Sequence, residues 1–287
     1  MKKNKTTIIL ILFFFIGLAI LIYPTLSNYT NKKLQSKAIV DYEEILKDIK
    51  KEDYDKYFKE AIDYNKRLSE LKYPFVDHDQ IEGYNDVLNV DGNGMIGYLL
   101  IPKINVELSI FHGTSQHTLN SSVGHLEGSS LPTGEIGTHV VLSAHTGLPS
   151  AKLFTNIDKL EKGDIFTIKI YDRSFSYEVD QIKIVKPNEL EDLKVEKDKE
   201  FVTLTTCTPY GLNTHRLLVR GHRTLNVKES TFINTEAFKV DKVIVCSVVT
   251  LPLLLIWIVM IIFEPTNKYV DYESIFVYPN KKKGRLK

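Results

Sequence analysis

The chain has 287 residues, enough for one fair-sized domain or two small ones, and its 37 Lys and Arg nearly balance its 36 Asp and Glu. A formal net charge of +1 provides no overall field for attracting nucleic acid, so we expect no nucleic-acid partner. The charge is unevenly placed, because residues 1–5 and 281–287 are both basic and each lies outside an apolar run.

Two uncharged apolar runs, Thr7–Tyr23 and Val243–Phe263, approach the length that crosses a hydrocarbon core of about 30 Å. The first run could also belong to a signal peptide. It is longer than the usual apolar core of such a peptide and no small-residue cleavage site follows it, so we favour a retained anchor. Lys and Arg stay on the cytoplasmic side, so we expect both termini in the cytoplasm and residues 24–242 outside.

The segment after the first apolar run is polar and predicts helices followed by a loop. Apolar residues recur at a spacing close to 3.6 within residues 28–71, which is typical of one or two amphipathic helices ending before Pro74. Residues 72–93 mix aromatic and acidic residues with Pro and Gly, a composition that favours an irregular loop.

From Gly94 the pattern changes to short segments rich in Val, Ile, Thr, Tyr and Phe, separated mostly by turn-forming residues. We expect strands at Met95–Ile101, Val106–Phe111, Thr138–Ser143, Asp164–Tyr171, Ser174–Val179, Ile182–Val185, Phe201–Thr206 and Arg216–Val219. Such closely spaced strands predict a mainly β domain, a closed barrel or a sandwich, over about 94–225. Ala151–Leu160 is expected to be one short helix within it.

Cys207 is the only cysteine of the predicted external domain, because Cys246 lies in the second apolar run. An unpaired cysteine in an external domain indicates either intermolecular pairing or a reactive thiol. Thr203, Thr205 and Cys207 alternate with other residues along a strand that ends near the cysteine. A hairpin-like return would bring Arg216 beside Cys207, where its guanidinium would favour the thiolate.

A cysteine nucleophile usually needs a histidine partner. The external domain holds His78, His112, His117, His125, His139, His145, His215 and His222. His145 follows directly on an apolar strand and enters a loop, a position from which side chains are presented to clefts. His139 lies six residues earlier, about 20 Å away in a strand, so both cannot reach one thiol.

The motif TLTTC at Thr203–Cys207 resembles the TLxTC signature of sortases, membrane-bound cysteine transpeptidases of Gram-positive bacteria. Arg216 and His145 match the catalytic arginine and histidine of that family. The wider similarity runs from about Gly94 to Arg223 and is to the pilus-assembling subgroup called class C. The N-terminal extension and the second apolar run also resemble that subgroup.

The resemblance implies an eight-stranded sortase-type β-barrel with short helices, an N-terminal helical and lid extension, and two transmembrane helices. It implies that Cys207 attacks the threonine carbonyl of an LPxTG-like sorting signal, with His145 and Arg216 assisting, and that a pilin lysine amine resolves the thioester. Thr205 and Thr206 are expected to contact the substrate. We expect no metal and no cofactor. The expected order is a cytoplasmic N-terminus (1–6), an anchor (7–23), the extension (24–93), the barrel (94–225), a linker (226–242), a second transmembrane helix (243–263) and a basic tail (264–287).

Two positions depart from the subgroup's pattern. The residue after the histidine, commonly Arg, is Thr146 here, which leaves the cysteine–histidine pair intact but alters substrate contacts. The lid motif, usually Asp-Pro-aromatic, reads Tyr73-Pro74-Phe75. The aromatic residue of the lid is present, whereas the acidic residue is out of register, with Asp77 or Asp79 as candidates to replace it.

Other functions stay open on the sequence alone. A housekeeping sortase would attach proteins to peptidoglycan instead of pilins, and a secreted cysteine peptidase would release acid instead of transferring the peptide. A zinc site is disfavoured, because no paired Cys or His spacing of the usual kind is present. A non-catalytic adhesin would tolerate the loss of Cys207.

Overall fold

The computed structural model describes residues 2–226 and, beyond them, residues 250, 254 and 257. The chain divides into two compact units, residues 1–235 and 236–287. The predicted linker, second transmembrane helix and basic tail therefore lie outside the described residues, apart from one residue of the linker and three within the apolar run.

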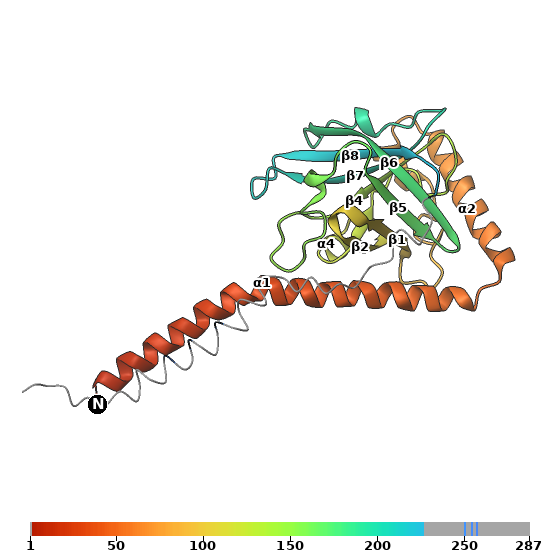
Figure 1. The fold of residues 1–287 in the computed structure, drawn as a ribbon. Coiled ribbons are helices and arrows are strands. Elements are labelled where there is room, and N and C mark those ends of the chain that lie inside the picture. Colours follow the sequence, from red (N-terminus) through yellow and green to blue (C-terminus); the bar gives the residue numbers. More distant parts are fainter. Residues whose placement is uncertain (1, 227–249, 251–253, 255–256, 258–287) are drawn as a thin grey trace, which may run out of the picture. The chain divides into compact units, whose positions relative to one another are not determined.

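Eight strands close into a barrel in the order β1-β2-β3-β4-β7-β8-β6-β5 (Figure 1), which confirms the predicted β-barrel. The strands are β1 (Met95–Ile101), β2 (Val106–His112), β3 (Val123–His125), β4 (Thr138–Ser143), β5 (Ile165–Ile170), β6 (Arg173–Val185), β7 (Glu200–Thr208) and β8 (His215–Arg223). The pairs β2–β3 and β4–β7 are parallel and the other neighbours are antiparallel. The parallel pair β4–β7 aligns the candidate site.

The helices are mostly short, except at the N-terminus. They are α1 (Lys2–Lys47), α2 (Lys51–Ser69), α3 (Pro74–Asp77) and α4 (Gln116–Leu119), with 3₁₀ turns η1 (His78–Gln80), η2 (Pro102–Ile104), η3 (Ile157–Lys159) and η4 (Glu191–Leu193). The predicted apolar run 7–23 forms part of α1. Among the described residues, α1 is the one helix long and apolar enough to cross a membrane.

The extension packs on the barrel through specific polar contacts. Gln35 of α1 accepts hydrogen bonds from the Ser109 backbone nitrogen (2.8 Å) and hydroxyl (2.6 Å) on β2. Tyr42 donates to the Ile96 carbonyl (3.0 Å) on β1. Because buried polar groups are costly when unpaired, these bonds fix where the second half of α1 rests on the barrel. The extension, for which one or two amphipathic helices were predicted, contains the second half of α1 and the whole of α2.

Three details differ from the sequence-based expectation. The two strands expected at residues 174–185 form the single strand β6, with a register shift between Val179 and Gln181. The three-residue strand β3 was not expected. The helix expected at Ala151–Leu160 is wrong, because only η3 forms there. Leu153 has φ +32°, and the Phe154 nitrogen donates to the His145 carbonyl (3.1 Å) in a neighbouring loop, so the segment forms short turns instead of a continuous α-helix.

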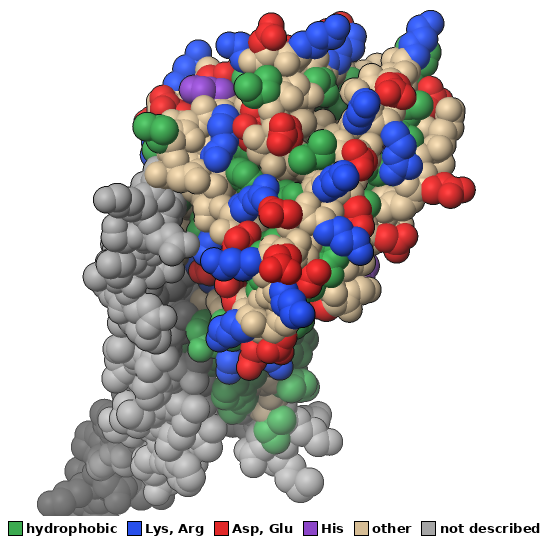
Figure 2. All heavy atoms as spheres, turned by 90° about the vertical axis from the view of Figure 1, so that its right-hand side faces the viewer, with side chains coloured by type: hydrophobic (Ala, Val, Ile, Leu, Met, Phe, Trp, Pro, Cys, Tyr) green, Lys and Arg blue, Asp and Glu red, His purple; other side chains and the backbone are tan. Residues whose placement is uncertain are grey.

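The barrel interior is filled by apolar side chains, as the alternation along the strands predicts. Phe166 and Tyr177 stack with ring centroids 5.6 Å apart, and both are fully buried. On the face seen in Figure 2, basic and acidic side chains are interspersed without a large region of one sign. This matches the balanced composition and gives that face no extended positive surface for nucleic acid.

Candidate active site

Three neighbouring strands bring the predicted catalytic residues to one edge of the barrel. The parallel register of β4 and β7 pairs Ser143 with Thr205, and the antiparallel register of β7 and β8 pairs Cys207 with Arg216. The hairpin predicted from the sequence is therefore confirmed. Arg216 lies directly opposite Cys207 across one strand pair.

Backbone contacts extend the β4–β7 alignment beyond the end of β4. The Ala144 nitrogen donates to the Thr205 carbonyl (3.3 Å), and the Thr206 hydroxyl donates to the Ala144 carbonyl (2.7 Å). His145 is the next residue, so its backbone starts beside the chain that leads from Thr206 into Cys207. The strand-end position predicted for His145 is confirmed.

The loop after His145 also contacts the loop after Cys207. Gly147 has φ +73°, and a Cβ on it would lie 2.5 Å from Cε2 of Tyr210. Only glycine therefore allows the Tyr210 ring to rest on this turn. The His145 ring is half-buried, with its Nε2 3.4 Å from Nε2 of Gln116. The contact between Gly147 and Tyr210 was not predicted from the sequence, although both residues lie in expected turns.

Arg216 has free hydrogen-bonding capacity toward the site. Its NH1 group donates to two backbone carbonyls, those of His215 (3.2 Å) and Asn213 (3.5 Å). Within residues 2–226 no carboxylate forms an ion pair with it. Arg220, four residues farther along β8 on the same face, instead makes a two-pronged contact with Asp180 at 3.0 Å. The guanidinium of Arg216 thus keeps donors for a group that develops negative charge beside Cys207.

The two threonines predicted to bind substrate point to opposite sides of β7. Thr205 shares the outer face with Cys207, whereas the Thr206 hydroxyl bonds inward to Ala144. Both are nearly buried. This places Thr205 on the surface that leads to Cys207, and it commits Thr206 to holding the backbone before His145. Their contact with substrate stays a prediction.

An apolar cluster covers the outer face of the same strands. It consists of Val141, Leu193 and Leu218, with Phe75, Leu126, Val185 and Leu190 packed against it, and we call it the outer-face cluster. Val141 and Leu218 come from β4 and β8, next to the strand that carries Cys207. Leu190 and Leu193 come from the β6–β7 connection, whose two leucines the sequence analysis had not identified; their i, i+3 spacing was the available signal.

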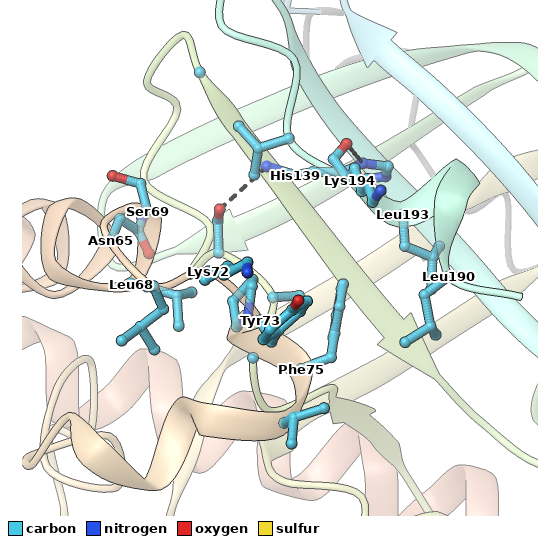
Figure 3. A pocket seen from close by; sticks show the side chains of 18 of the residues that line it. Asn65, Leu68, Ser69, Lys72, Tyr73, Phe75, His139, Leu190, Leu193 and Lys194 are labelled. Atoms are coloured by element: carbon cyan, nitrogen blue, oxygen red, sulfur yellow. Dashed lines mark hydrogen bonds between the residues drawn. The ribbon is translucent and has the colours of Figure 1, made fainter. Parts of the chain in front are cut away.

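The predicted lid motif lies at the start of α3, with Tyr73 directly before the helix, and its aromatic residue Phe75 packs against the outer-face cluster (Figure 3). Gly128 fits closely under this turn, because a Cβ there would lie 2.5 Å from the Pro74 carbonyl oxygen. Tyr73 is 56% exposed. Of the two acidic residues considered as replacements, Asp79 faces His78 at 3.2 Å.

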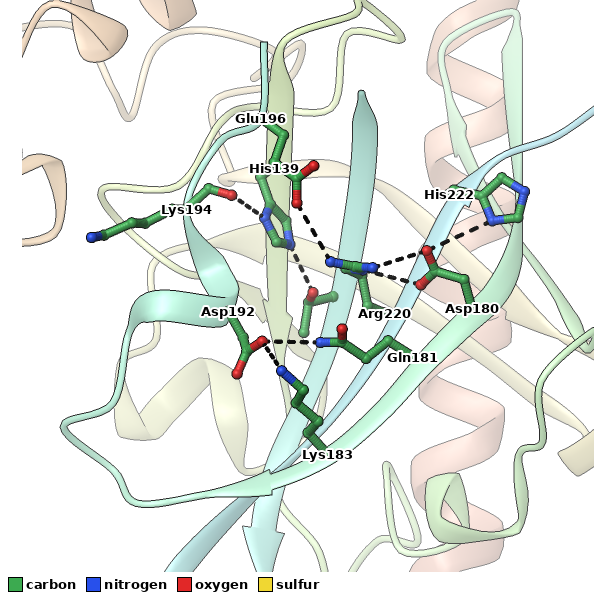
Figure 4. Close-up of polar contacts among 10 residues, drawn as sticks. His139, Asp180, Gln181, Lys183, Asp192, Lys194, Glu196, Arg220 and His222 are labelled. Carbon is green, nitrogen blue, oxygen red and sulfur yellow. Dashed lines mark hydrogen bonds and ion pairs between the residues drawn. The ribbon is translucent and has the colours of Figure 1, made fainter. Parts of the chain in front are cut away.

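The remaining buried histidines are structural in their contacts. His139 lies 1% exposed at the start of β4, where Nδ1 donates to the Lys194 carbonyl (2.9 Å) and Nε2 accepts from the Thr203 hydroxyl (2.7 Å) (Figure 4). Burial lowers the pKa of His139. In residues 2–226 no cluster of His, Cys, Asp or Glu is arranged to hold a metal ion.

The buried histidines predict a loss of stability in acid. Burial lowers the pKa of His125 to about 4, against about 6.5 for an exposed imidazole. Between pH 6.5 and 4, His125 therefore binds a proton in the unfolded chain but not in the folded chain. The free energy of unfolding falls as pH drops through this range, by about 3 kcal/mol for this group. Denaturant unfolding at stepped pH measures this slope.

His125→Gln is the matched variant for that slope. Glutamine can still donate to the Ser130 carbonyl and accept from Tyr84, which contact the imidazole at 2.8 and 2.9 Å. We expect the variant to lose less stability than the wild type between pH 6.5 and 4. Identical slopes for the two proteins would contradict the assignment.

Comparison with known proteins shows similarity to sortases. A family model of the sortase domain matches residues 99–224. Sortase D from Bacillus subtilis is 35% identical over 130 residues, which span 44% of this chain and 63%, less than two thirds, of that protein.

Solved structures cover more of the chain. Sortase C1 from Streptococcus agalactiae is 46% identical with a TM-score of 0.61, over 67% of this chain and 100% of that one. Sortase C from Streptococcus pneumoniae, whose crystal structure addresses catalysis and pilin substrate specificity, is 38% identical with a TM-score of 0.60, over 66% and 97%. The sortase domain match and this identity over whole solved sortases show that the chain belongs to the sortase family of cysteine transpeptidases.

Proposed function

We propose that this protein joins pilin subunits through Cys207, His145 and Arg216. The observation that carries the proposal is the register that sets Cys207 opposite Arg216, with His145 just after the end of β4, the strand on the other side of β7. A nucleophile, an acid–base group and an unpaired cation meet at one edge, which is what acyl transfer from a peptide needs. The pilin substrate of the similar Streptococcus pneumoniae enzyme supports the choice of pilins.

The reaction proceeds in two acyl transfers. The Cys207 thiolate attacks the threonine carbonyl of an LPxTG-like signal, and Arg216 donates to the oxyanion that forms. The Thr–Gly bond breaks as protonated His145 gives its proton to the departing glycine amine, which leaves a thioester. A lysine amine of the next pilin attacks the thioester, His145 takes the proton, and an isopeptide bond replaces the carbon–sulfur bond.

The membrane arrangement is part of the proposal. Residues 7–23, within α1, anchor the chain, residues 243–263 form a second span, and both basic ends lie in the cytoplasm. The barrel then lies outside the cell beside substrates that are themselves anchored, which raises their effective concentration. Reporters fused after Lys287 and inserted near Glu229 test this topology, and an external reading at Lys287 would refute it.

The test of the activity is intact-mass spectrometry of the full chain in detergent with an LPxTG-type peptide. We expect a mass gain equal to the fragment ending in threonine, mapped to Cys207. Adding a pilin peptide that carries the acceptor lysine should remove the adduct and yield the cross-linked product. Removal by water alone indicates a peptidase, and removal by a peptidoglycan stem peptide in preference to the pilin peptide indicates the housekeeping reaction. Either outcome would overturn pilin polymerisation.

The proposed lid gives a separate prediction. Phe75 occupies the outer-face cluster beside the strands that carry the site, so a substrate side chain must displace it. Removing the ring by Phe75→Ala forfeits about 1–2 kcal/mol of apolar contact in the closed state. We expect acylation of Cys207 by the sorting peptide to accelerate about tenfold, measured as thioester formed per unit time.

Val76→Ala is the control for the lid, because Val76 follows in the same helical turn and is 73% exposed. Its acylation rate should equal that of the wild type. Equal rates for the Phe75 and Val76 variants would remove the covering role. Point variants are preferred to deleting the predicted loop 72–93. Leu88 in this segment is buried in the core, and Tyr84 packs against the core.

A further inference from the structure

A pocket of about 690 Å³ lies between the end of α2, the lid and the β6–β7 connection (Figure 3). Its size falls in the range of ligand-binding sites. Apolar side chains such as Leu68 and Leu193 line it together with His139. The three residues assigned to chemistry do not line this pocket, so it is a separate site on the protein.

The pocket and the proposed catalytic site lie at two ends of one protein surface. Along β4, His139 lines the pocket, Val141 belongs to the outer-face cluster, and His145 follows the strand at the other end. Six residues of strand separate the two histidines, a distance of about 20 Å. An extended peptide with its reacting carbonyl at Cys207 therefore reaches the pocket with the residue about six positions away.

The order of the two acyl transfers determines which part of the substrate lies in the pocket. Everything after the Thr–Gly bond departs when the thioester forms, whereas everything before it stays covalently attached until the acceptor amine arrives. A pocket that holds the substrate through both steps must bind the part before the bond. Counted back from the threonine, the first three of those six positions are the rest of the motif, so the pocket meets up to three residues that precede the leucine.

The charges around the pocket indicate what those residues are. Its lining includes Lys72, Lys194 and Lys197 and contains no Asp or Glu. The Lys194 ammonium has an exposed partner, Glu191, at 2.8 Å, and such exposed pairs are weak. A basic rim over apolar walls is complementary to a peptide with acidic and apolar side chains.

The wall formed by the β6–β7 connection has a hydrogen bond to the barrel in addition to its apolar contact with the lid. The carbonyl of Lys194 accepts the hydrogen bond from His139, which is anchored in turn on Thr203 of β7 (Figure 4). When the lid segment is displaced by substrate, this wall and its two lysines stay. The part of the pocket that carries the charge complementarity is thus preformed.

We propose that this pocket binds the pilin residues immediately before the sorting motif and selects acidic and apolar side chains there. The inference rests on the proposed function and adds a determinant of which pilin is used as donor. It assigns Lys194 and Lys197 a role in substrate specificity, and their side chains do not contact the reacting bond.

The test compares three peptides on the full chain in detergent: the bare LPxTG-type motif, the motif preceded by Val-Glu-Glu, and the motif preceded by Val-Lys-Lys. We expect the acidic extension to raise kcat/KM for thioester formation about fivefold over the bare motif, and the gain to shrink in 1 M salt. In Lys194→Glu/Lys197→Glu the preference should reverse toward the basic extension, with the bare motif unchanged. Lys162→Glu, an exposed residue outside the pocket, should behave as the wild type.

Equal kcat/KM for all three peptides would overturn the inference while leaving the catalytic proposal intact. So would an equal loss on every peptide in the double variant, because that marks a general defect. A chain that forms no thioester with any of the peptides would instead overturn the proposed function, and the inference with it. The bare motif therefore separates the two failures.

Discussion

Replacing Cys207 by alanine is expected to abolish the thioester adduct and to lower kcat/KM by at least about 10⁴-fold. The reaction divides through a covalent intermediate on sulfur, and no neighbouring group can take that role, so the loss should resemble removal of a nucleophile in other acyl-transfer enzymes. The measurement is intact mass after incubation with the sorting peptide, followed by product analysis with the lysine acceptor.

The chain supplies its own control, because its second cysteine, Cys246, lies in the apolar run 243–263. Cys246→Ala should retain the adduct and the rate. An adduct that persists in Cys207→Ala and disappears in Cys246→Ala would refute the assignment of the nucleophile. Because Cys207 is half-buried at the end of β7, the alanine variant should unfold at nearly the wild-type denaturant concentration.

The strand that carries Cys207 was predictable because its signal is local. Alternation in TLTTC fixes which residues share a face with Cys207, and the turn after it predicts the antiparallel return that brings Arg216 opposite. The pairing of β4 with β7 is parallel and joins residues about sixty positions apart, so no turn or spacing specifies it. The proximity of His145 could be inferred only from the family resemblance.

The features that the sequence did not predict correctly have the same physical origin. Strand β3 has three residues, too few for a periodic pattern to show. The segment Ala151–Leu160 has helix-compatible residues, yet Phe154 bonds to the His145 backbone and tertiary contacts override local preference. The lid residue Phe75 was identified from its motif, but its partners Leu193 and Leu218 depend on how three distant segments meet.

These long-range contacts also explain why the site is ordered before substrate arrives. Tyr210 on Gly147 joins the loops that follow Cys207 and His145, and Thr206 holds the backbone before His145. A site whose groups are already placed loses less freedom in the transition state. In the proposed function, the lid and the β6–β7 connection select the donor peptide, because Phe75, Leu190 and Leu193 cover the outer face next to the strand that carries Cys207.

Removing the guanidinium by Arg216→Ala is expected to lower kcat for thioester formation by about 10²–10³-fold, the usual cost of losing one oxyanion donor. Arg216 sits opposite Cys207 with no carboxylate partner in residues 2–226, so its donors are available to the substrate. Arg216→Lys keeps the charge but loses the planar fork, so it should recover only part of the rate.

The division between kcat and KM distinguishes two roles for this residue. If Arg216 stabilises the oxyanion, kcat and kcat/KM fall together while KM stays near the wild-type value, because the interaction exists only in the transition state. If it only positions the peptide, KM rises and kcat stays unchanged, which would contradict the mechanism proposed above. Arg67→Ala, at an exposed position on α2, should leave both constants unchanged. The free guanidinium opposite the thiol favours the first result, since a cation that only held the ground-state peptide would gain nothing from lying beside the attacking sulfur.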